Sequence, residues 1–205
     1  MIERQGIDEL YNTETEMTND STTRPTVGSE EYAAVTGPAT IRIERMLPGP
    51  IERVWSYLTD SAKRGTWLAE GEMEPRVGGR VEHIFRDNEL TEDDDPPPDK
   101  YAHIADEFHM TGRIIVADAP HKLSYSWFDE FGESEVKFEL TPVDDKVHLV
   151  LTHSRLTDRR QIVGAAGGWH VHLDILEARL AGRKPEGFWR SFNRLEGEYE
   201  LRIEN

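Results

Sequence analysis

The sequence predicts an α+β protein in which a curved antiparallel β-sheet wraps around a long C-terminal helix, with two short helices after the first strand. Segments that alternate apolar and polar residues, as half-buried strands do, follow one another between residues 40 and 153. After them, Ile162, Trp169, Leu173 and Leu176 recur on one helix face at about 100° per residue. Because this stripe needs an apolar partner, we expect the helix to lie across the sheet.

The first strand is expected at residues 40–47, where apolar side chains alternate with charged ones. Pro48, Gly49 and Pro50 end it. Apolar residues at helical spacing then predict a short helix over residues 51–58, and a second helical or turn segment is expected over residues 61–68.

The rest of the sheet follows at even spacing, which favours an antiparallel meander. In a strand predicted at residues 80–86, Val81, His83 and Phe85 share one side. Between strands, residues 92–99 combine four acidic residues, three prolines and a final aspartate into what we expect to be a solvated loop. The further strands are predicted at residues 104–110, 111–117, 122–128, 133–141 and 146–153.

The composition predicts one domain with additions at both ends. Residues 1–31 are acidic and contain few large apolar side chains, so we expect a flexible N-terminal arm. Residues 32–205 are expected to form a single domain. It includes an extra C-terminal helix at about residues 186–203, where Phe188 and Phe192 begin an apolar stripe.

Charge and residue usage exclude several classes of function. The 205 residues contain 24 Lys and Arg against 40 Asp and Glu, a net charge of −16, which disfavours nucleic-acid binding. No cysteine is present, so disulfides, thiolate metal sites and cysteine nucleophiles are excluded together. No apolar run is long enough for a membrane span or a signal core, so we expect a cytoplasmic protein without membrane insertion. The sequence carries no signal for an oligomeric state.

We expect no metal site and no cofactor. His170 and His172 are two residues apart and point to different helix faces, unlike the pair four residues apart that binds zinc. His148 and His153 fall on opposite sides of their predicted strand. The glycine pair Gly78-Gly79 lacks the strand and helix context of a phosphate-binding loop and is interpreted as a turn.

Several stretches carry a resemblance to a known family: residues 43–48 with 50–55, Gly78-Gly79-Arg80, Gly112-Arg113-Ile114, residues 123–127, and Gly168-Trp169 with His172-Leu173 and Leu176. Over roughly residues 32–203 the chain resembles the SRPBCC superfamily, which includes the START and birch-pollen-allergen proteins. Within it, the chain is most similar to the branch named after the C-terminal domain of the activator of the heat-shock-protein-90 ATPase. The resemblance implies the helix-grip fold.

A cavity between the sheet and the long helix is the predicted site. An apolar helix stripe with an aromatic ring can cover a cavity as well as a solid core, so Trp169 is either a lining residue or core filling. His172 is likewise either a polar anchor for a ligand or a histidine hydrogen-bonded within the core. The residues predicted to bind ligand are Trp67, Phe85, Tyr125, Trp127, Trp169, His172 and Leu176.

The predicted function is the non-catalytic binding of a small hydrophobic or amphipathic molecule, and no catalytic residue is predicted. The resemblance also implies an alternative, a polyketide cyclase or aromatase-like enzyme in which His172, Arg113 or Tyr125 polarises an oxygen. A third alternative is a protein-interaction or co-chaperone-like module that uses the sheet face or the last helix.

Overall fold

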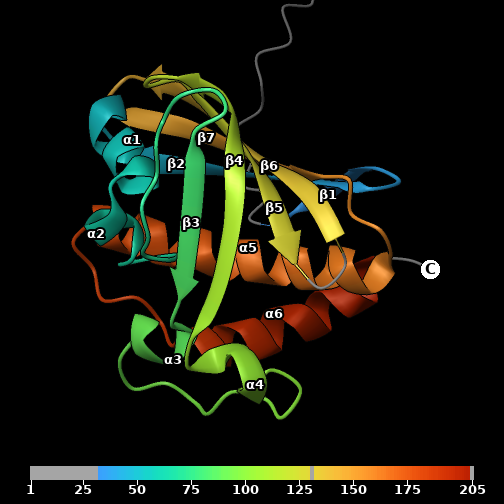
Figure 1. The fold of residues 1–205 in the computed structure, drawn as a ribbon. Coiled ribbons are helices and arrows are strands. Elements are labelled where there is room, and N and C mark those ends of the chain that lie inside the picture. Colours follow the sequence, from blue (N-terminus) through green and yellow to red (C-terminus); the bar gives the residue numbers. More distant parts are fainter. Residues whose placement is uncertain (1–31, 130–131, 204–205) are drawn as a thin grey trace, which may run out of the picture.

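A computed structural model describes residues 32–129 and 132–203 of the chain. A seven-stranded antiparallel sheet, ordered β1-β2-β7-β6-β5-β4-β3, curves around the long helix α5 (Arg159–Leu180) (Figure 1). The predicted α+β helix-grip fold is therefore confirmed. The predicted N-terminal arm, residues 1–31, lies outside the described residues.

The strands are β1 (Ala34–Gly37), β2 (Thr40–Pro48), β3 (Arg80–Phe85), β4 (Phe108–Asp118), β5 (Lys122–Asp129), β6 (Gly132–Val143) and β7 (Lys146–Ser154). The helices besides α5 are α1 (Ile51–Thr59), α2 (Ser61–Arg64), α3 (Asp87–Leu90), α4 (Ala102–Ala105) and α6 (Phe188–Arg202). Among the described residues, no helix is both long and apolar enough to cross a lipid bilayer.

The strand predictions need two corrections. A short edge strand, β1, precedes the strand predicted as first, and its mostly exposed residues explain why no apolar alternation announces it. The strands predicted at residues 104–110 and 111–117 join into one strand, β4, which begins only at Phe108. The predicted strand start at Ile104 is wrong, because Ile104 lies in helix α4. Strand β4 runs unbroken through Gly112, where a Cβ atom would lie only 2.1 Å from the carbonyl oxygen of Ser126 on β5. Glycine therefore marks a close approach of two strands here and not a turn.

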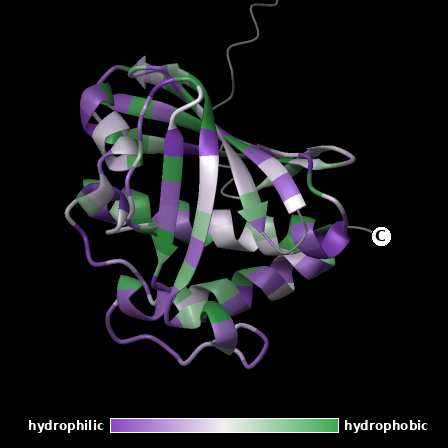
Figure 2. Ribbon diagram, in the orientation of Figure 1, coloured by the Kyte–Doolittle hydropathy of each residue, from purple (hydrophilic) through white to green (hydrophobic). Residues whose placement is uncertain are grey.

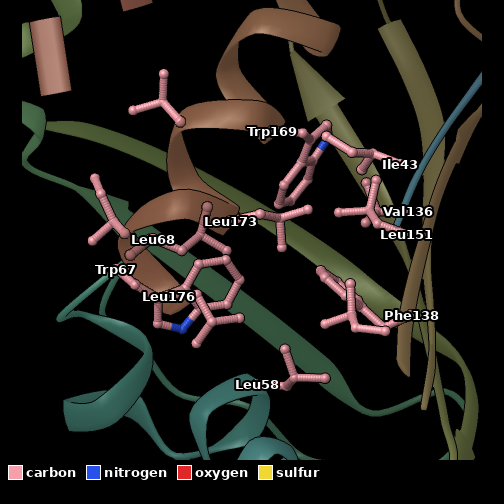
Figure 3. Close-up of a cluster of buried hydrophobic side chains, with 14 of the residues drawn as sticks. Ile43, Leu58, Trp67, Leu68, Val136, Phe138, Leu151, Trp169, Leu173 and Leu176 are labelled. Carbon is pink, nitrogen blue, oxygen red and sulfur yellow. The ribbon is translucent and has the colours of Figure 1, made fainter. Parts of the chain in front are cut away.

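Helix α5 is buried on two sides, which a single apolar stripe does not predict. Trp169, Leu173 and Leu176 point into the sheet and pack in the main core (Figure 3). The opposite side faces α6, where Gly167 is close enough for an added Cβ to touch Phe192 at 3.6 Å. Figure 1 shows α6 packed along α5 on the side away from the upper sheet. The helix thus links two apolar layers.

The acidic loop at residues 92–99 is not simply solvated. The Asp94 carboxylate accepts hydrogen bonds from the backbone N–H groups of Trp189 and Arg190, at 2.8 and 3.1 Å, and so caps the first turn of α6. It also accepts from the Thr91 hydroxyl at 3.1 Å. Polar residues of this loop are coloured purple at the foot of the molecule in Figure 2, where they meet the start of α6. This cap anchors α6 below the sheet.

The beginning of the described chain is held by α6. The Ala33 N–H donates to the Tyr199 hydroxyl at 2.6 Å, and Tyr32 donates to Glu198. The same hydroxyl also forms a hydrogen bond with His170 Nδ1 at 2.9 Å. The fully buried Tyr199 side chain therefore joins the N-terminal segment to α5 and α6.

Candidate functional site

A cavity of about 570 Å³ lies between the first half of α5, strands β3 to β5 and β7, the segment around α4, and α6. This volume is within the range of small-molecule sites. The cavity exists because α5 presents small residues there. Gly164, Ala165 and Gly168 all line it, and an added Cβ at Gly164 would meet no atom within 4 Å.

Aromatic rings form a large part of the cavity wall. Trp127 on β5 and Trp169 on α5 lie with ring centroids 5.2 Å apart, and Phe85 on β3 is 5.8 Å from Trp127. Phe108 and Phe192 add rings from β4 and α6. Such a wall offers flat apolar surface to a ligand and few charges.

The structure brings four of the seven predicted ligand-binding residues together at this cavity: Phe85, Trp127, Trp169 and His172. The other three, Trp67, Tyr125 and Leu176, are almost completely buried and are not among the residues that line it. Figure 3 shows Trp67 and Leu176 side by side in the core. Trp67 also donates its indole N–H to the Tyr57 carbonyl at 2.8 Å, which ties the short helices to the sheet end.

Trp169 is fixed by a chain of hydrogen bonds. Its indole N–H donates to His153 Nδ1 at 3.0 Å, so the proton of the neutral imidazole must be on Nε2, which faces Ser134 Oγ at 2.7 Å. The Ser134 hydroxyl donates to the Trp127 carbonyl at 3.3 Å. Burial lowers the pKa of His153 to about 3, so the ring is neutral near pH 7. Both of its nitrogens are thus occupied in orienting the cavity wall.

His172 has a different arrangement. Its Nδ1 is 2.8 Å from the Trp67 carbonyl oxygen, which can only accept, so Nδ1 carries the proton. Burial lowers the pKa of His172 to about 4. The ring lines the cavity and contacts Phe188, with ring centroids 5.0 Å apart.

Polar side chains also border the cavity. Glu196 on α6 accepts from the Tyr101 hydroxyl at 2.5 Å and from Lys100 Nζ at 2.7 Å. At the start of α5, Gln161 Nε2 donates to the Asp129 carboxylate at 3.0 Å. The bonds to Glu196 hold the α4 segment against α6. The bond between Gln161 and Asp129 holds the end of β5 against α5.

A buried polar pair lies behind the aromatic wall. His83 on β3 is fully buried among Tyr125, Trp127 and Phe85, and desolvation lowers its pKa well below the ordinary value. The Arg64 guanidinium, 1% exposed, donates to the backbone carbonyls of residues 69, 71 and 82. Neither residue is part of the cavity lining.

The sequence interpretation missed the cavity residues outside the sheet and α5. Tyr101, Ile104 and Phe192 line the cavity from the α4 segment and α6. The apolar stripe that begins at Phe188 is a sequence signal for Phe192, whereas Tyr101 and Ile104 lie in a segment that carries no such pattern. In the residues that the structure describes, no group of three or more His, Asp or Glu side chains is arranged to hold a metal ion.

Comparison with known proteins identifies relatives of the whole domain. Residues 48–181 match the family model described as activator of Hsp90 ATPase homolog 1-like protein. A Bordetella parapertussis protein, encoded by gene BPP1335 and solved by NMR in solution, is 39% identical, with a TM-score of 0.71. The match covers 84% of this chain and 90% of that one. No protein with curated annotation matches the chain.

More distant structures share the fold. CalU16 from Micromonospora echinospora, in its crystal structure, is 23% identical over 84% of this chain and 98% of its own, with a TM-score of 0.62. A conserved protein of unknown function from Enterococcus faecalis is 20% identical over 82% of this chain and 90% of its own, with a TM-score of 0.57. The family model spans most of the domain and the Bordetella protein is well above 30% identity, so the chain belongs to the activator of Hsp90 ATPase homolog 1-like family, a branch of the SRPBCC superfamily.

Proposed function

We propose that this protein binds a small hydrophobic or amphipathic molecule in the cavity between the sheet and α5, without catalysing a reaction on it. The observation behind the proposal is the cavity itself, about 570 Å³ with six Phe, Tyr and Trp side chains in its wall. Such a wall favours apolar ligands because it removes their surface from water.

The hydrogen bonds of His153 and Gln161 support binding over catalysis by these two lining residues. His153 uses both ring nitrogens to orient Trp169 and Ser134. Gln161 accepts from Thr157 through Oε1 and donates to Asp129 through Nε2. A general acid or base needs a group that can exchange a proton with the substrate, and these two side chains are committed to the protein.

Filling the cavity from within tests the proposal. Gly164→Phe places a ring where a Cβ meets open space, and the change also favours the helix. We expect the wild type to bind the uncharged fluorescent probe N-phenyl-1-naphthylamine saturably and the variant to bind it at least ~10-fold more weakly. Circular dichroism and urea unfolding check that the variant is folded.

The matched control is Gly197→Phe on α6, where an added Cβ also meets nothing within 4 Å and the position is exposed. This variant should bind the probe as the wild type does. The proposal fails if the wild type shows no saturable binding, or if Gly164→Phe binds as tightly as the Gly197→Phe control.

A further inference from the structure

The hydrogen-bonding state of His172 is set by the protein. The Trp67 carbonyl, 2.8 Å from Nδ1, requires a proton on that nitrogen. Burial lowers the pKa of the ring to about 4, so a second proton is disfavoured near pH 7. Near pH 7 the opposite nitrogen, Nε2, is therefore a hydrogen-bond acceptor only.

No described residue donates to this acceptor. The contacts of His172 within the described chain are the Trp67 bond and ring contacts with Phe85, Trp169 and Phe188. Nε2 is also not among the fully buried polar atoms that lack a partner, and the ring lines the cavity. The acceptor is thus accessible from the cavity, in an otherwise apolar part of its wall.

We propose that the ligand is an aromatic molecule carrying a hydroxyl group that donates a hydrogen bond to His172 Nε2. This inference rests on the proposed function and names its ligand class. A buried acceptor that stays unpaired in the complex is costly, so the site favours a donor at this point over an ether or a carbonyl. The flat surfaces of Trp169 and Phe85 beside His172 favour an aromatic body for the same ligand.

A pair of probes in which a methyl group replaces the hydroxyl hydrogen tests the inference. 2-Naphthol carries a hydroxyl donor, and its methyl ether keeps the ring system but cannot donate. We expect the wild type to bind 2-naphthol about 10-fold more tightly than the ether in equilibrium dialysis at pH 7, the size of one net hydrogen bond. His172→Phe should bind both probes equally and keep the affinity for the ether within about threefold.

His109→Phe is the control variant, because His109 is exposed and lies outside the cavity lining. It should keep the wild-type preference. A wild type that binds both probes equally, or a preference that survives in His172→Phe, overturns the inference and leaves the proposed function standing. A wild type that binds neither probe overturns the proposed function as well.

A measurement on the wild type covers the case in which His172→Phe does not fold. NMR of protein with nitrogen-15-labelled histidine reports the two nitrogens of each ring separately. Adding 2-naphthol should shift the Nε2 resonance of His172, whereas the ether should shift it much less. Equal shifts with both probes contradict the donor requirement.

Discussion

Trp169 and His153 form a single unit, in which the indole N–H of Trp169 donates to His153 Nδ1 at 3.0 Å across the boundary between α5 and β7. The Trp169 side chain is part of the core and also part of the cavity wall. Its ring packs against Phe138, with centroids 5.8 Å apart, and another part of it lines the cavity.

Two substitutions of Trp169 should separate its roles. Trp169→Phe keeps an apolar ring but leaves His153 Nδ1 unpaired, so we expect a loss of ~1–2 kcal/mol in the free energy of unfolding. Trp169→Ala removes the packing too and should lose ~3–5 kcal/mol. Urea unfolding measures both losses. Equal losses in the two variants would show that packing of the ring contributes nothing beyond the hydrogen bond.

The α4 segment should open more easily when its link to Glu196 is cut. Tyr101→Phe removes the hydroxyl that donates to Glu196 but keeps the ring against Phe192, at a centroid distance of 5.2 Å. We expect faster hydrogen exchange at the amides of α4 (Ala102–Ala105), because local opening becomes less costly. Asp99→Asn in the same segment is the control, because Asp99 is exposed, and this variant should exchange as the wild type does. Identical exchange in Tyr101→Phe and the wild type would rule out this link as a restraint.

Stability should fall as the pH falls below about 6.5. Burial lowers the pKa of His83, His153, His170 and His172, to about 3 for His153 and His170 and to about 4 for His172. A histidine in an unfolded chain has a pKa near 6.5, so below that pH the unfolded state binds protons that the folded state does not. The free energy of unfolding therefore has its full value above pH ~6.5 and decreases as the pH falls toward ~4.

Urea unfolding at pH 7.5, 6 and 5 measures this slope. Burial raises the pKa of Asp87 to about 7, which opposes the slope by the share of one proton, but the four histidines together outweigh it. His172→Phe should flatten it by the share of one proton, at most ~1.4 kcal/mol per pH unit. A free energy of unfolding that stays constant or rises between pH 6.5 and 5 would contradict the neutral buried imidazoles.

The start of the folded domain can be located by truncation. Deleting residues 1–31 should change the free energy of unfolding by less than ~1 kcal/mol, as expected for an arm with little apolar area. Deleting residues 1–33 should cost ~1–3 kcal/mol more, because it removes the bonds from Tyr32 to Glu198 and from Ala33 to Tyr199. Equal stability of the two truncated proteins would show that this anchor is unimportant.

The spacing of apolar residues along the chain predicted which sides of individual strands and helices are buried. The alternation of Val81, His83 and Phe85 predicted which side of β3 is buried, and the stripe through Trp169 predicted the side of α5 that faces the sheet. The division of β4 was wrong, because Gly112 serves a close approach between neighbouring strands that no local pattern encodes.

The rest of the candidate site depends on contacts between distant residues. Tyr101 is held at the cavity by its hydrogen bond to Glu196, 95 positions further along the chain. Asp94 looks like one of several loop carboxylates in the sequence but caps a helix that begins at Phe188. Arg64 is in a polar stretch that predicts exposure, yet backbone carbonyls around it make its burial stable.

The position of a bound aromatic molecule shows whether the cavity between the sheet and α5 is the ligand site. Intermolecular NOEs between 2-naphthol and the labelled protein report which rings the probe touches. If the probe binds in the cavity, we expect NOEs to the ring protons of Trp127 and Trp169, which line it. NOEs only to Ile115 and Phe128, which are exposed on the outer face of the sheet, would place the probe outside the cavity and contradict ligand binding between the sheet and α5.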